Sequence, residues 1–296
     1  MTGTTLVILT LNEIEGLRHV FPKIPTAAVD EVLAVDGGST DGTLEFFADH
    51  GVRTVRQTKR GRGEAFRLAA RAARHDWLVF FSPDGNEDPN DIPRLRQGLA
   101  DGHDMVIASR FMAGARSEDD DKFLFASRRW GNLTFTWLAN ALWPGRPRIT
   151  DTINGFRAVT RPAFERLAPD AEGYAIEFQM SMRALQLRLR VLEIPTVESE
   201  RFGKGVSKLH AIPVGLQFLR LMVNGARRSG SSSPSGRYSS PARSRSALRP
   251  ASAPTSTRTT SSSSRPCSRS SSSAMRCTGT IRRCSTCRSS SPSTRG

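Results

Sequence analysis

Short runs of apolar residues alternate along the chain with segments whose apolar positions recur every three or four residues. The runs predict buried strands and the longer period predicts amphipathic helices, an alternation typical of βα units that build a mostly parallel sheet. We expect strands at residues 5–9, 31–35, 52–56, 77–81 and 104–108. We expect helices between them at residues 15–24, 43–50, 63–74 and 91–100.

Beyond residue 111 this rhythm is lost. Residues 112–122 are rich in Gly, Ser and acids and predict a mobile loop, and residues 123–143 predict one long apolar helix. Later elements are expected as a turn and strand at 151–159, a helix at 176–187, a strand at 191–197 and a helix at 210–227. The last helix is amphipathic, which fits either a helix packed on the core or one lying on a membrane surface.

The composition changes abruptly near residue 228. All 28 acidic residues lie at or before Glu200, and all four cysteines lie at or after Cys267. The formal charge of +15 divides into +3 for residues 1–228 and +12 for residues 229–296, which hold 25 Ser and 12 Arg. We expect one domain over residues 1–228 and a disordered tail over residues 229–296, because the tail cannot bury enough apolar surface to offset chain entropy.

The absence of cysteine from residues 1–228 excludes a disulfide scaffold or a Cys-ligated metal centre there and fits a reducing compartment. The sequence pattern contains neither a secretory signal nor an uninterrupted apolar span, so a cytoplasmic protein is expected. The loss of every acid and lysine at one point also suggests that the tail is a frame-shifted segment. Translation of the coding DNA in the other two frames beyond Arg228 tests that hypothesis.

Polar residues, glycines and cations follow the first four predicted strands. These segments are residues 10–13 (Thr-Leu-Asn-Glu), 36–42 (Asp-Gly-Gly-Ser-Thr-Asp-Gly), 59–63 (Lys-Arg-Gly-Arg-Gly) and 82–88 (Ser-Pro-Asp-Gly-Asn-Glu-Asp). Open α/β sheets bind ligands at the carboxyl ends of their strands, so one binding edge is expected. A Rossmann dinucleotide site is disfavoured, because no third glycine follows Gly61 and Gly63 at the required spacing.

Residues 10–13, residues 35–43 and residues 108–111 (Ala-Ser-Arg-Phe) resemble the motifs of family 2 glycosyltransferases with the GT-A fold. The chain is most similar to the subgroup that acts on polyprenyl (dolichol) phosphates, which residues 151–157, 178–180 and 201–208 also match. The resemblance covers about residues 4–226. It implies a GT-A sheet and an inverting transfer of a hexose from a UDP- or GDP-sugar to a polyprenyl phosphate, with peripheral contact at the cytoplasmic membrane face.

The resemblance also implies roles for individual residues. Leu11, Glu13 and Asp36 are implied to hold the base and ribose, and Lys59 and the Gly61–Gly63 loop to flank the donor. The full implied substrate-binding set is Leu11, Asn12, Glu13, Asp36, Gly37, Lys59, Gly61, Gly63, Asp84, Gly85, Asn86, Asp151, Asn154, Gln179, Arg201 and Lys208.

A magnesium or manganese ion is implied at residues 82–86. The family motif usually has two acids that flank one residue, whereas Ser82 replaces the first acid here. Asp84 and Asn86 remain as the expected ligands, and the donor diphosphate has to supply further oxygens because hard cations prefer several of them.

The catalytic residues that the resemblance implies are Asp84, Arg110, Arg129, Arg157 and Glu177. A phosphate acceptor is already anionic and needs no strong base, so positioning and charge stabilisation are expected to dominate. Arg110 and Arg129 are implied to hold the acceptor phosphate, and Arg201 and Lys208 to lie nearer the leaving diphosphate.

Some of these roles have structural alternatives. Ser181 stands where relatives commonly have an acid, which Glu177 can replace from one helical turn away. Arg157 can instead pair with Asp151, and Gln179 can instead cap backbone groups.

Three other functions stay open from the residues alone. A hydroxyl acceptor would need an acid as base, for which Asp151 and Glu177 are available. A sugar-nucleotide nucleotidyltransferase would share the sheet, but its Gly-rich, basic signature after the first strand is missing. A nucleic-acid-binding protein could act through the tail, yet Tyr238 is the only aromatic residue there, so no specific nucleic acid is expected.

Overall fold

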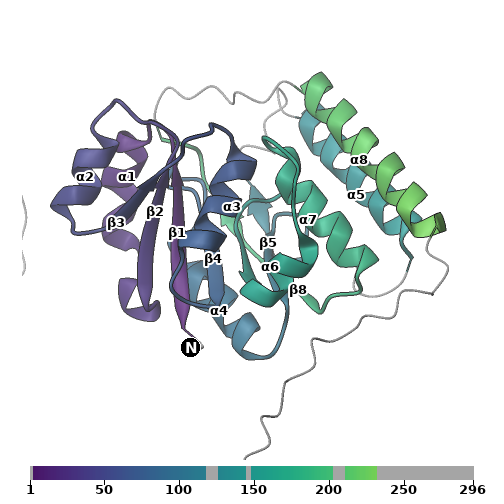
Figure 1. Ribbon diagram of the computed structural model, residues 1–296, viewed down its shortest axis with the longest axis horizontal. Helices are drawn as coiled ribbons and strands as arrows, with labels where there is room; N and C mark the ends of the chain where they lie inside the picture. The colour runs from purple at the N-terminus through teal and green to yellow at the C-terminus, as the bar shows by residue number, and fades with distance from the viewer. Residues whose placement is uncertain (1–2, 118–125, 145–147, 203–210, 232–296) are drawn as a thin grey trace, which may run out of the picture. The chain divides into compact units, whose positions relative to one another are not determined.

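The computed structural model describes residues 3–117, 126–144, 148–202 and 211–231. Seven strands in these ranges form one sheet with the order β3-β2-β1-β4-β7-β5-β8 (Figure 1). They are β1 (Thr4–Thr10), β2 (Glu31–Asp36), β3 (Arg53–Arg56), β4 (Trp77–Phe81), β5 (Met105–Ser109), β7 (Arg157–Thr160) and β8 (Val191–Pro195). β7 is antiparallel to its neighbours β4 and β5, and the other pairs are parallel.

Helices cover both faces of this sheet. One face carries α1 (Ile14–Val20), α2 (Thr43–Asp49) and α4 (Ile92–Ala100), and the other carries α3 (Arg62–Ala72), α6 (Arg161–Leu167) and α7 (Ala175–Gln186). Along β1, Leu6 and Ile8 enter the first core, while Val7 and Leu9 enter the second. The strands are apolar runs rather than alternating patterns because both of their faces are buried.

Two longer helices, α5 (Ala126–Leu142) and α8 (Ala211–Ser231), lie side by side next to α7 (Figure 1). Phe178 of α7 stacks on Phe218 of α8 with ring centroids 4.4 Å apart. Phe135 of α5 meets Phe218 edge-on at 5.2 Å, which ties the three helices together. Within the described ranges, no helix combines the length and the apolar character that a bilayer crossing requires.

A second, two-stranded sheet joins the segments that follow β5 and β8. β6 (Arg116–Ser117) pairs in parallel with β9 (Val197–Glu198). β6 lies in the segment for which a loop is expected, and the remainder of that segment, residues 118–122, is outside the described ranges. The pairing brings Glu198 to the same edge of the main sheet as the loops after β1 to β4.

The expected α/β fold class with a mostly parallel sheet is confirmed, as are the first five strands. The strand expected at residues 191–197 is divided into β8 and β9 at Thr196, directly after Pro195, which has no N–H to donate. Helix α6 is absent from the sequence prediction, although Thr160 caps its start by accepting a hydrogen bond from the Ala163 N–H at 3.3 Å. Most of the tail, residues 232–296, lies outside the described ranges.

Gly16 lets α1 pack directly on the loop after β4. A Cβ at this position would clash with the carbonyl oxygen of Pro83, so we expect Gly16→Ala to lower the free energy of unfolding by about 1–3 kcal/mol. Gly131 on α5 has open space around its Cβ position, so Gly131→Ala is expected to raise that free energy by about 0.5–1 kcal/mol. Urea unfolding measures both variants, and equal stabilities would contradict this packing.

Candidate active site

The loops after β1 and β2 are locked together by side-chain to backbone hydrogen bonds. The buried carboxylate of Asp36 accepts from the N–H groups of Gly38 at 2.8 Å and Ser39 at 3.0 Å. Asn12 accepts from the N–H of Thr40 at 2.9 Å, and its own N–H donates to the Ser39 hydroxyl at 2.9 Å. The Asp36 side chain, for which the resemblance implies a contact with the base or ribose, is therefore hydrogen-bonded within its own loop.

An apolar side chain is exposed beside these loops. Leu11 is 38% exposed, and a Cβ on Gly37 would lie 3.4 Å from its side chain and 3.2 Å from Oε1 of Gln57. Glycine at position 37 therefore keeps the surface beside Leu11 clear. The partly exposed Glu13 follows, with its N–H donated to the Thr43 hydroxyl at 3.2 Å. An exposed apolar side chain next to polar groups can hold a planar base and a ribose.

The loop after β3 is pinned to the segment that precedes α7. Lys59 forms an ion pair with Glu172, and the Gln57 amide donates to the carbonyl of Gly61 at 2.9 Å. A Cβ at Gly63 would clash with the carbonyl oxygen of Ala171, so the start of α3 depends on this glycine. Lys59 thus remains exposed at the edge, while its charge is matched by a surface carboxylate.

Arg62, the first residue of α3, lies in the Gly61–Gly63 loop that is expected to flank the donor, but the sequence prediction gives it no role of its own. It forms an ion pair with the buried Glu177 of α7, and its two terminal nitrogens lie 3.4 Å from the hydroxyl of Ser82. Burial opposes the charge of the guanidinium, but the attraction and hydrogen bond of Glu177 outweigh it and raise the pKa of Arg62. A permanent cation therefore stands beside the position at which the family motif has its first acid.

The loop after β4 presents two buried oxygens that the rest of the described chain does not satisfy. They are Oδ1 of Asp84 and Oδ1 of Asn86. The other carboxylate oxygen of Asp84 lies 3.3 Å from Nε of Arg201. Burial raises the pKa of Asp84 although Arg201 and Arg62 favour its charged form. Buried polar atoms normally have partners, and two hard oxygens from residues two positions apart in one loop suit a divalent cation.

The described side chains contain no cluster of three His, Cys, Asp or Glu residues that could hold a metal ion. A cation at this loop would therefore have Asp84 and Asn86 as its protein ligands, as the sequence predicts. The two unsatisfied oxygens fit that role, and Ser82, whose hydroxyl faces Arg62, has no carboxylate to add.

The chain that follows β9 covers this loop. The N–H of Phe202 donates to the carbonyl of Asp84 at 2.7 Å, and the N–H of Ser199 donates to that of Asn86 at 3.0 Å. Gly85 has a positive φ of 90°, and a Cβ there would collide with the Phe202 ring. These contacts place Arg201 beside Asp84.

A buried charge cluster lies where β5 ends. Arg110 donates to both carboxylate oxygens of Asp151, from Nε at 2.7 Å and from a terminal nitrogen at 3.0 Å. Burial disfavours the charge of Asp151, but its contacts with Arg110 prevail and lower the pKa of this carboxyl. Asn154 donates to Glu198 at 3.0 Å, and Glu198 lies 3.9 Å from Arg110. The predicted residues Arg110, Asp151 and Asn154 are thus brought together.

Arg157 is fully buried in the centre of the sheet. Its guanidinium donates to the backbone carbonyls of Asn154 at 2.9 Å and Glu177 at 3.0 Å, and to the Ser181 hydroxyl at 3.2 Å. Burial lowers the pKa of Arg157 to about 10. Asp151 pairs with Arg110, so the alternative pairing of Arg157 with Asp151 does not occur. Arg157 holds the residue 151–157 turn to α7.

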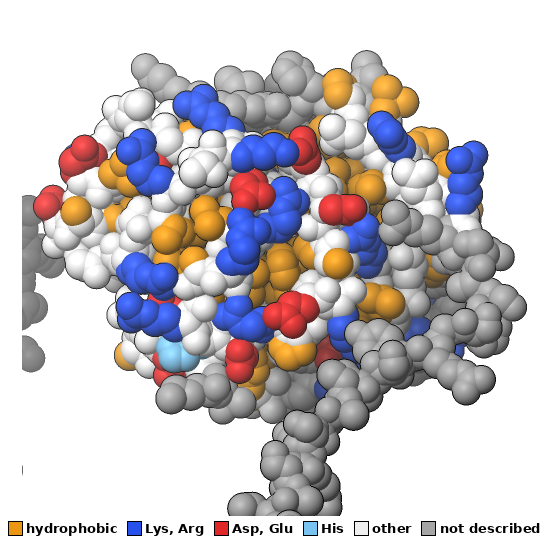
Figure 2. Space-filling model, in the orientation of Figure 1, with side chains coloured by type: hydrophobic (Ala, Val, Ile, Leu, Met, Phe, Trp, Pro, Cys, Tyr) orange, Lys and Arg blue, Asp and Glu red, His pale blue; other side chains and the backbone are white. Residues whose placement is uncertain are grey.

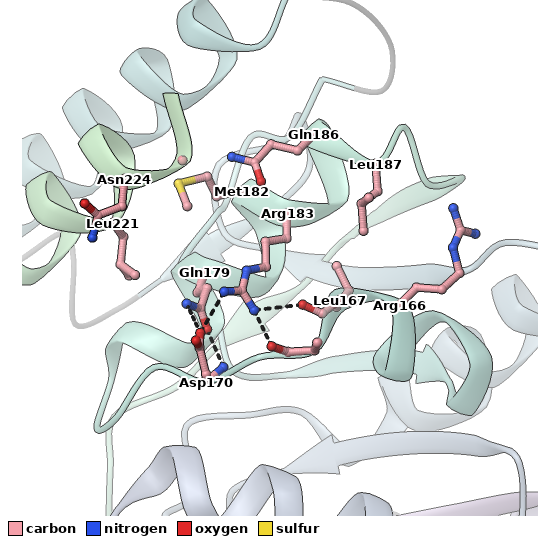
Figure 3. A pocket seen from close by; sticks show the side chains of 12 residues that line it. Arg166, Leu167, Asp170, Gln179, Met182, Arg183, Gln186, Leu187, Leu221 and Asn224 are labelled. Carbon is pink, nitrogen blue, oxygen red and sulfur yellow. Dashed lines mark hydrogen bonds and ion pairs between the residues drawn. The ribbon is translucent and has the colours of Figure 1, made fainter. Parts of the chain in front are cut away.

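Gln179 lies in a different place from the edge loops. Its amide oxygen accepts from the N–H groups of Asp170 and Ala171, both at 2.8 Å, and its nitrogen donates to Asp170. It lines a pocket with Arg183 and with residues of α8 (Figure 3). Gln179 thus caps backbone groups and supports the segment that contacts Gly63.

Arg129 and Lys208 are the other residues predicted to bind the acceptor phosphate or the leaving diphosphate. Arg129 is exposed on α5. Lys208 lies outside the described residues, so the structure gives no place for it.

Residues 5–167 match the family model described as Glycosyl transferase family 2. A polyprenol monophosphomannose synthase of Mycolicibacterium smegmatis is 30% identical over 70% of this chain and 82% of its own length. An undecaprenyl-phosphate mannosyltransferase of Micrococcus luteus is 31% identical over 71% of this chain and 88% of its own length.

A solved structure shares the fold. Glucosyl-3-phosphoglycerate synthase from Mycobacterium tuberculosis, in complex with Mn²⁺, UDP and glucosyl-3-phosphoglycerate, superposes with a TM-score of 0.62 at 22% identity. The match covers 76% of this chain and 80% of that chain. The same synthase has also been solved with Mg²⁺ and UDP.

The Arg110–Asp151 pair makes stability depend on pH in a defined direction. Because the folded pKa of Asp151 is below its ordinary value of 3.8, the stabilisation is complete above pH 3.8 and is lost as the pH falls through the folded pKa. We expect Asp151→Asn to lower the free energy of unfolding by about 3 kcal/mol at neutral pH, because Arg110 loses its buried partner. Urea unfolding at decreasing pH should show the difference from wild type shrinking below pH 3.8, and a constant difference would contradict this assignment.

Proposed function

The chain belongs to glycosyl transferase family 2, and from this premise we propose that it moves a hexose from a UDP- or GDP-sugar to a polyprenyl phosphate. The observation that carries the proposal is the pair of unsatisfied oxygens of Asp84 and Asn86 beside two guanidinium groups. Arg201 contacts Asp84, and Arg62 faces Ser82 in the same loop. This combination suits a diphosphate that carries a divalent cation.

The donor is proposed to lie along the carboxyl ends of β1 to β4. Its base would rest on Leu11 and its ribose near Glu13, on the surface that Gly37 keeps clear. Asp36 and Asn12 act by holding the two loops in place. From there the diphosphate would reach the residue 82–88 loop, with Lys59 and Gly61 along its path.

Mg²⁺ or Mn²⁺, held by Asp84 and Asn86, would supply positive charge to the leaving diphosphate when bound. Arg62 and Arg201 add fixed positive charge from the protein itself, in a partly buried place where such charge acts strongly. Glu177 orients Arg62, and Arg157 orients Glu177 through its backbone carbonyl.

A phosphate acceptor fits this chain better than a hydroxyl acceptor. A hydroxyl needs a general base, but both candidate carboxylates are in ion pairs, Asp151 with Arg110 and Glu177 with Arg62. The lowered pKa of Asp151 makes it a weak base. A phosphate oxygen is already anionic, so it needs only positioning, for which Arg110 and Arg129 are proposed.

The names of the two mannosyl-transferring relatives support a lipid-linked acceptor and make mannose the first sugar to test. The acceptor phosphate lies at a membrane surface, so we also propose peripheral contact with the cytoplasmic face of the membrane.

The direct test is transfer from a panel of labelled UDP- and GDP-hexoses by the purified full chain with Mg²⁺ or Mn²⁺ and detergent. We expect one donor to label a polyprenyl phosphate, which is recovered in the organic phase. Consumption of donor only with a soluble sugar acceptor, and never with the lipid phosphate, would refute the acceptor assignment.

Asp84→Asn removes the carboxylate charge while it keeps the shape of the side chain. We expect kcat/KM to fall by about two orders of magnitude with little change in unfolding free energy, because the diphosphate loses its cation. Ser82→Ala is the matched control in the same loop and should have a mild effect. Activity that persists in Asp84→Asn, or in wild type with excess chelator, would rule out the metal role.

A further inference from the structure

Helices α5 and α8 each expose a stripe of large apolar side chains. On α5, Trp130 and Trp137 are 70% and 67% exposed and stand two helical turns apart. On α8, Leu216, Leu219 and Val223 are 65%, 49% and 46% exposed and recur with helical spacing. Contiguous exposed apolar surface of this kind marks interaction sites in soluble proteins.

The packing of the two helices does not use these stripes. α5 buries Thr136 and Ala139, and α8 buries Phe218 and Met222. The exposed stripe of α8 faces away from Phe218. At about 100° of rotation per residue, residues 216, 219 and 223 lie about 100 to 160° around the helix axis from residue 218. Among the described residues, the packing of the two helices leaves both stripes exposed.

The charge on these helices has one sign. α5 and α8 contain five arginines and no acidic residue, whereas acids and bases nearly balance over residues 1–228. Arg220 and Arg227 are exposed and border the apolar stripe of α8. Figure 2 shows hydrophobic and basic side chains, without acidic ones, over α8 at the upper right.

We propose that the outer stripes of α5 and α8 dock the protein on an anionic lipid bilayer. This inference rests on the proposed function, because it supplies the surface that brings the site to a lipid phosphate. The tryptophan rings would sit at the boundary between headgroups and acyl chains, with the α8 leucines in the acyl region. Arg220 and Arg227 would reach back to lipid phosphates along their apolar stems.

A bilayer fits these stripes better than a second copy of the chain does. A symmetric contact between two copies would place the same patch against itself, so arginines would face arginines without any acid from either helix. An anionic lipid surface complements both the apolar stripe and its basic border.

Docking on this face connects to the candidate site through α7. Phe178 stacks on Phe218 of α8, and the adjacent residue, Glu177, pairs with Arg62 at the edge of the sheet. One helix thus separates the proposed lipid contact from the proposed diphosphate contact.

The test uses the full chain and two kinds of vesicle, phosphatidylcholine alone and phosphatidylcholine mixed with phosphatidylglycerol. We expect Trp130→Ser/Trp137→Ser to weaken binding to the mixed vesicles by about tenfold or more, because two large apolar side chains are lost. Leu187→Ser is the matched control, since Leu187 is 41% exposed outside the two helices. All variants keep the basic tail, so its attraction to the vesicles cancels in the comparison.

Brominated acyl chains then report which tryptophans enter the bilayer. We expect the brominated chains to quench the tryptophan fluorescence of the wild type. We expect Trp130→Phe/Trp137→Phe to bind the vesicles but to lose most of this quenching, because the two remaining tryptophans, Trp77 and Trp143, are partly buried in the protein. Arg220→Gln/Arg227→Gln should reduce the preference for anionic vesicles, whereas Arg188→Gln should not.

Transfer assays separate this inference from the proposed function. Trp130→Ser/Trp137→Ser should transfer sugar normally in detergent and slowly to acceptor embedded in vesicles. If wild type binds through the two tryptophans but never labels a lipid phosphate, the proposed function fails and the docking surface stands. The docking surface would be overturned if the tryptophan variants showed unchanged vesicle binding and quenching. It would also be overturned if the tryptophan substitutions converted a dimer of this chain to a monomer without any effect on vesicle binding.

Discussion

The buried guanidinium of Arg157 is the contact on which the geometry of the candidate site depends. It extends from β7, the antiparallel strand between β4 and β5, to the backbone carbonyls of Asn154 and Glu177. A buried cation is costly unless its donors are satisfied, so these bonds hold the 151–157 turn and the first turn of α7 in one arrangement. Asp151 then faces Arg110, and Glu177 faces Arg62.

The resulting edge of the sheet has most of its charges paired. The carboxylates of Asp151, Glu177, Glu172 and Asp84 each have a basic partner. Among the described residues, Oδ1 of Asp84, Oδ1 of Asn86 and Oε2 of Glu177 are nevertheless buried without a hydrogen-bond partner. Because unsatisfied buried oxygens cost stability, their place marks where a ligand is expected to compensate. In this protein a single carboxylate and two nearby guanidinium groups stand where the family motif has a pair of acids.

The strands and the binding edge follow from local patterns, because buried parallel strands are apolar runs and each is followed by glycines and polar residues. The antiparallel position of β7 between β4 and β5 does not follow from local patterns, because it depends on pairing between segments far apart in the chain. The two-residue strands β6 and β9 are too short to show a period. The individual role of Arg62 within the Gly61–Gly63 loop is not predictable for a similar reason, since its partner Glu177 is 115 residues away in the chain.

In the proposed function, Asp84 and Asn86 hold a divalent cation on the diphosphate of a sugar nucleotide. Crystals of the full chain grown with Mn²⁺ and each nucleoside diphosphate would locate the metal through its anomalous scattering. We expect a manganese peak within coordination distance of Oδ1 of Asp84 and Oδ1 of Asn86, with the base against Leu11. A bound nucleotide whose manganese lies elsewhere, or whose diphosphate contacts neither Arg62 nor Arg201, would contradict this assignment.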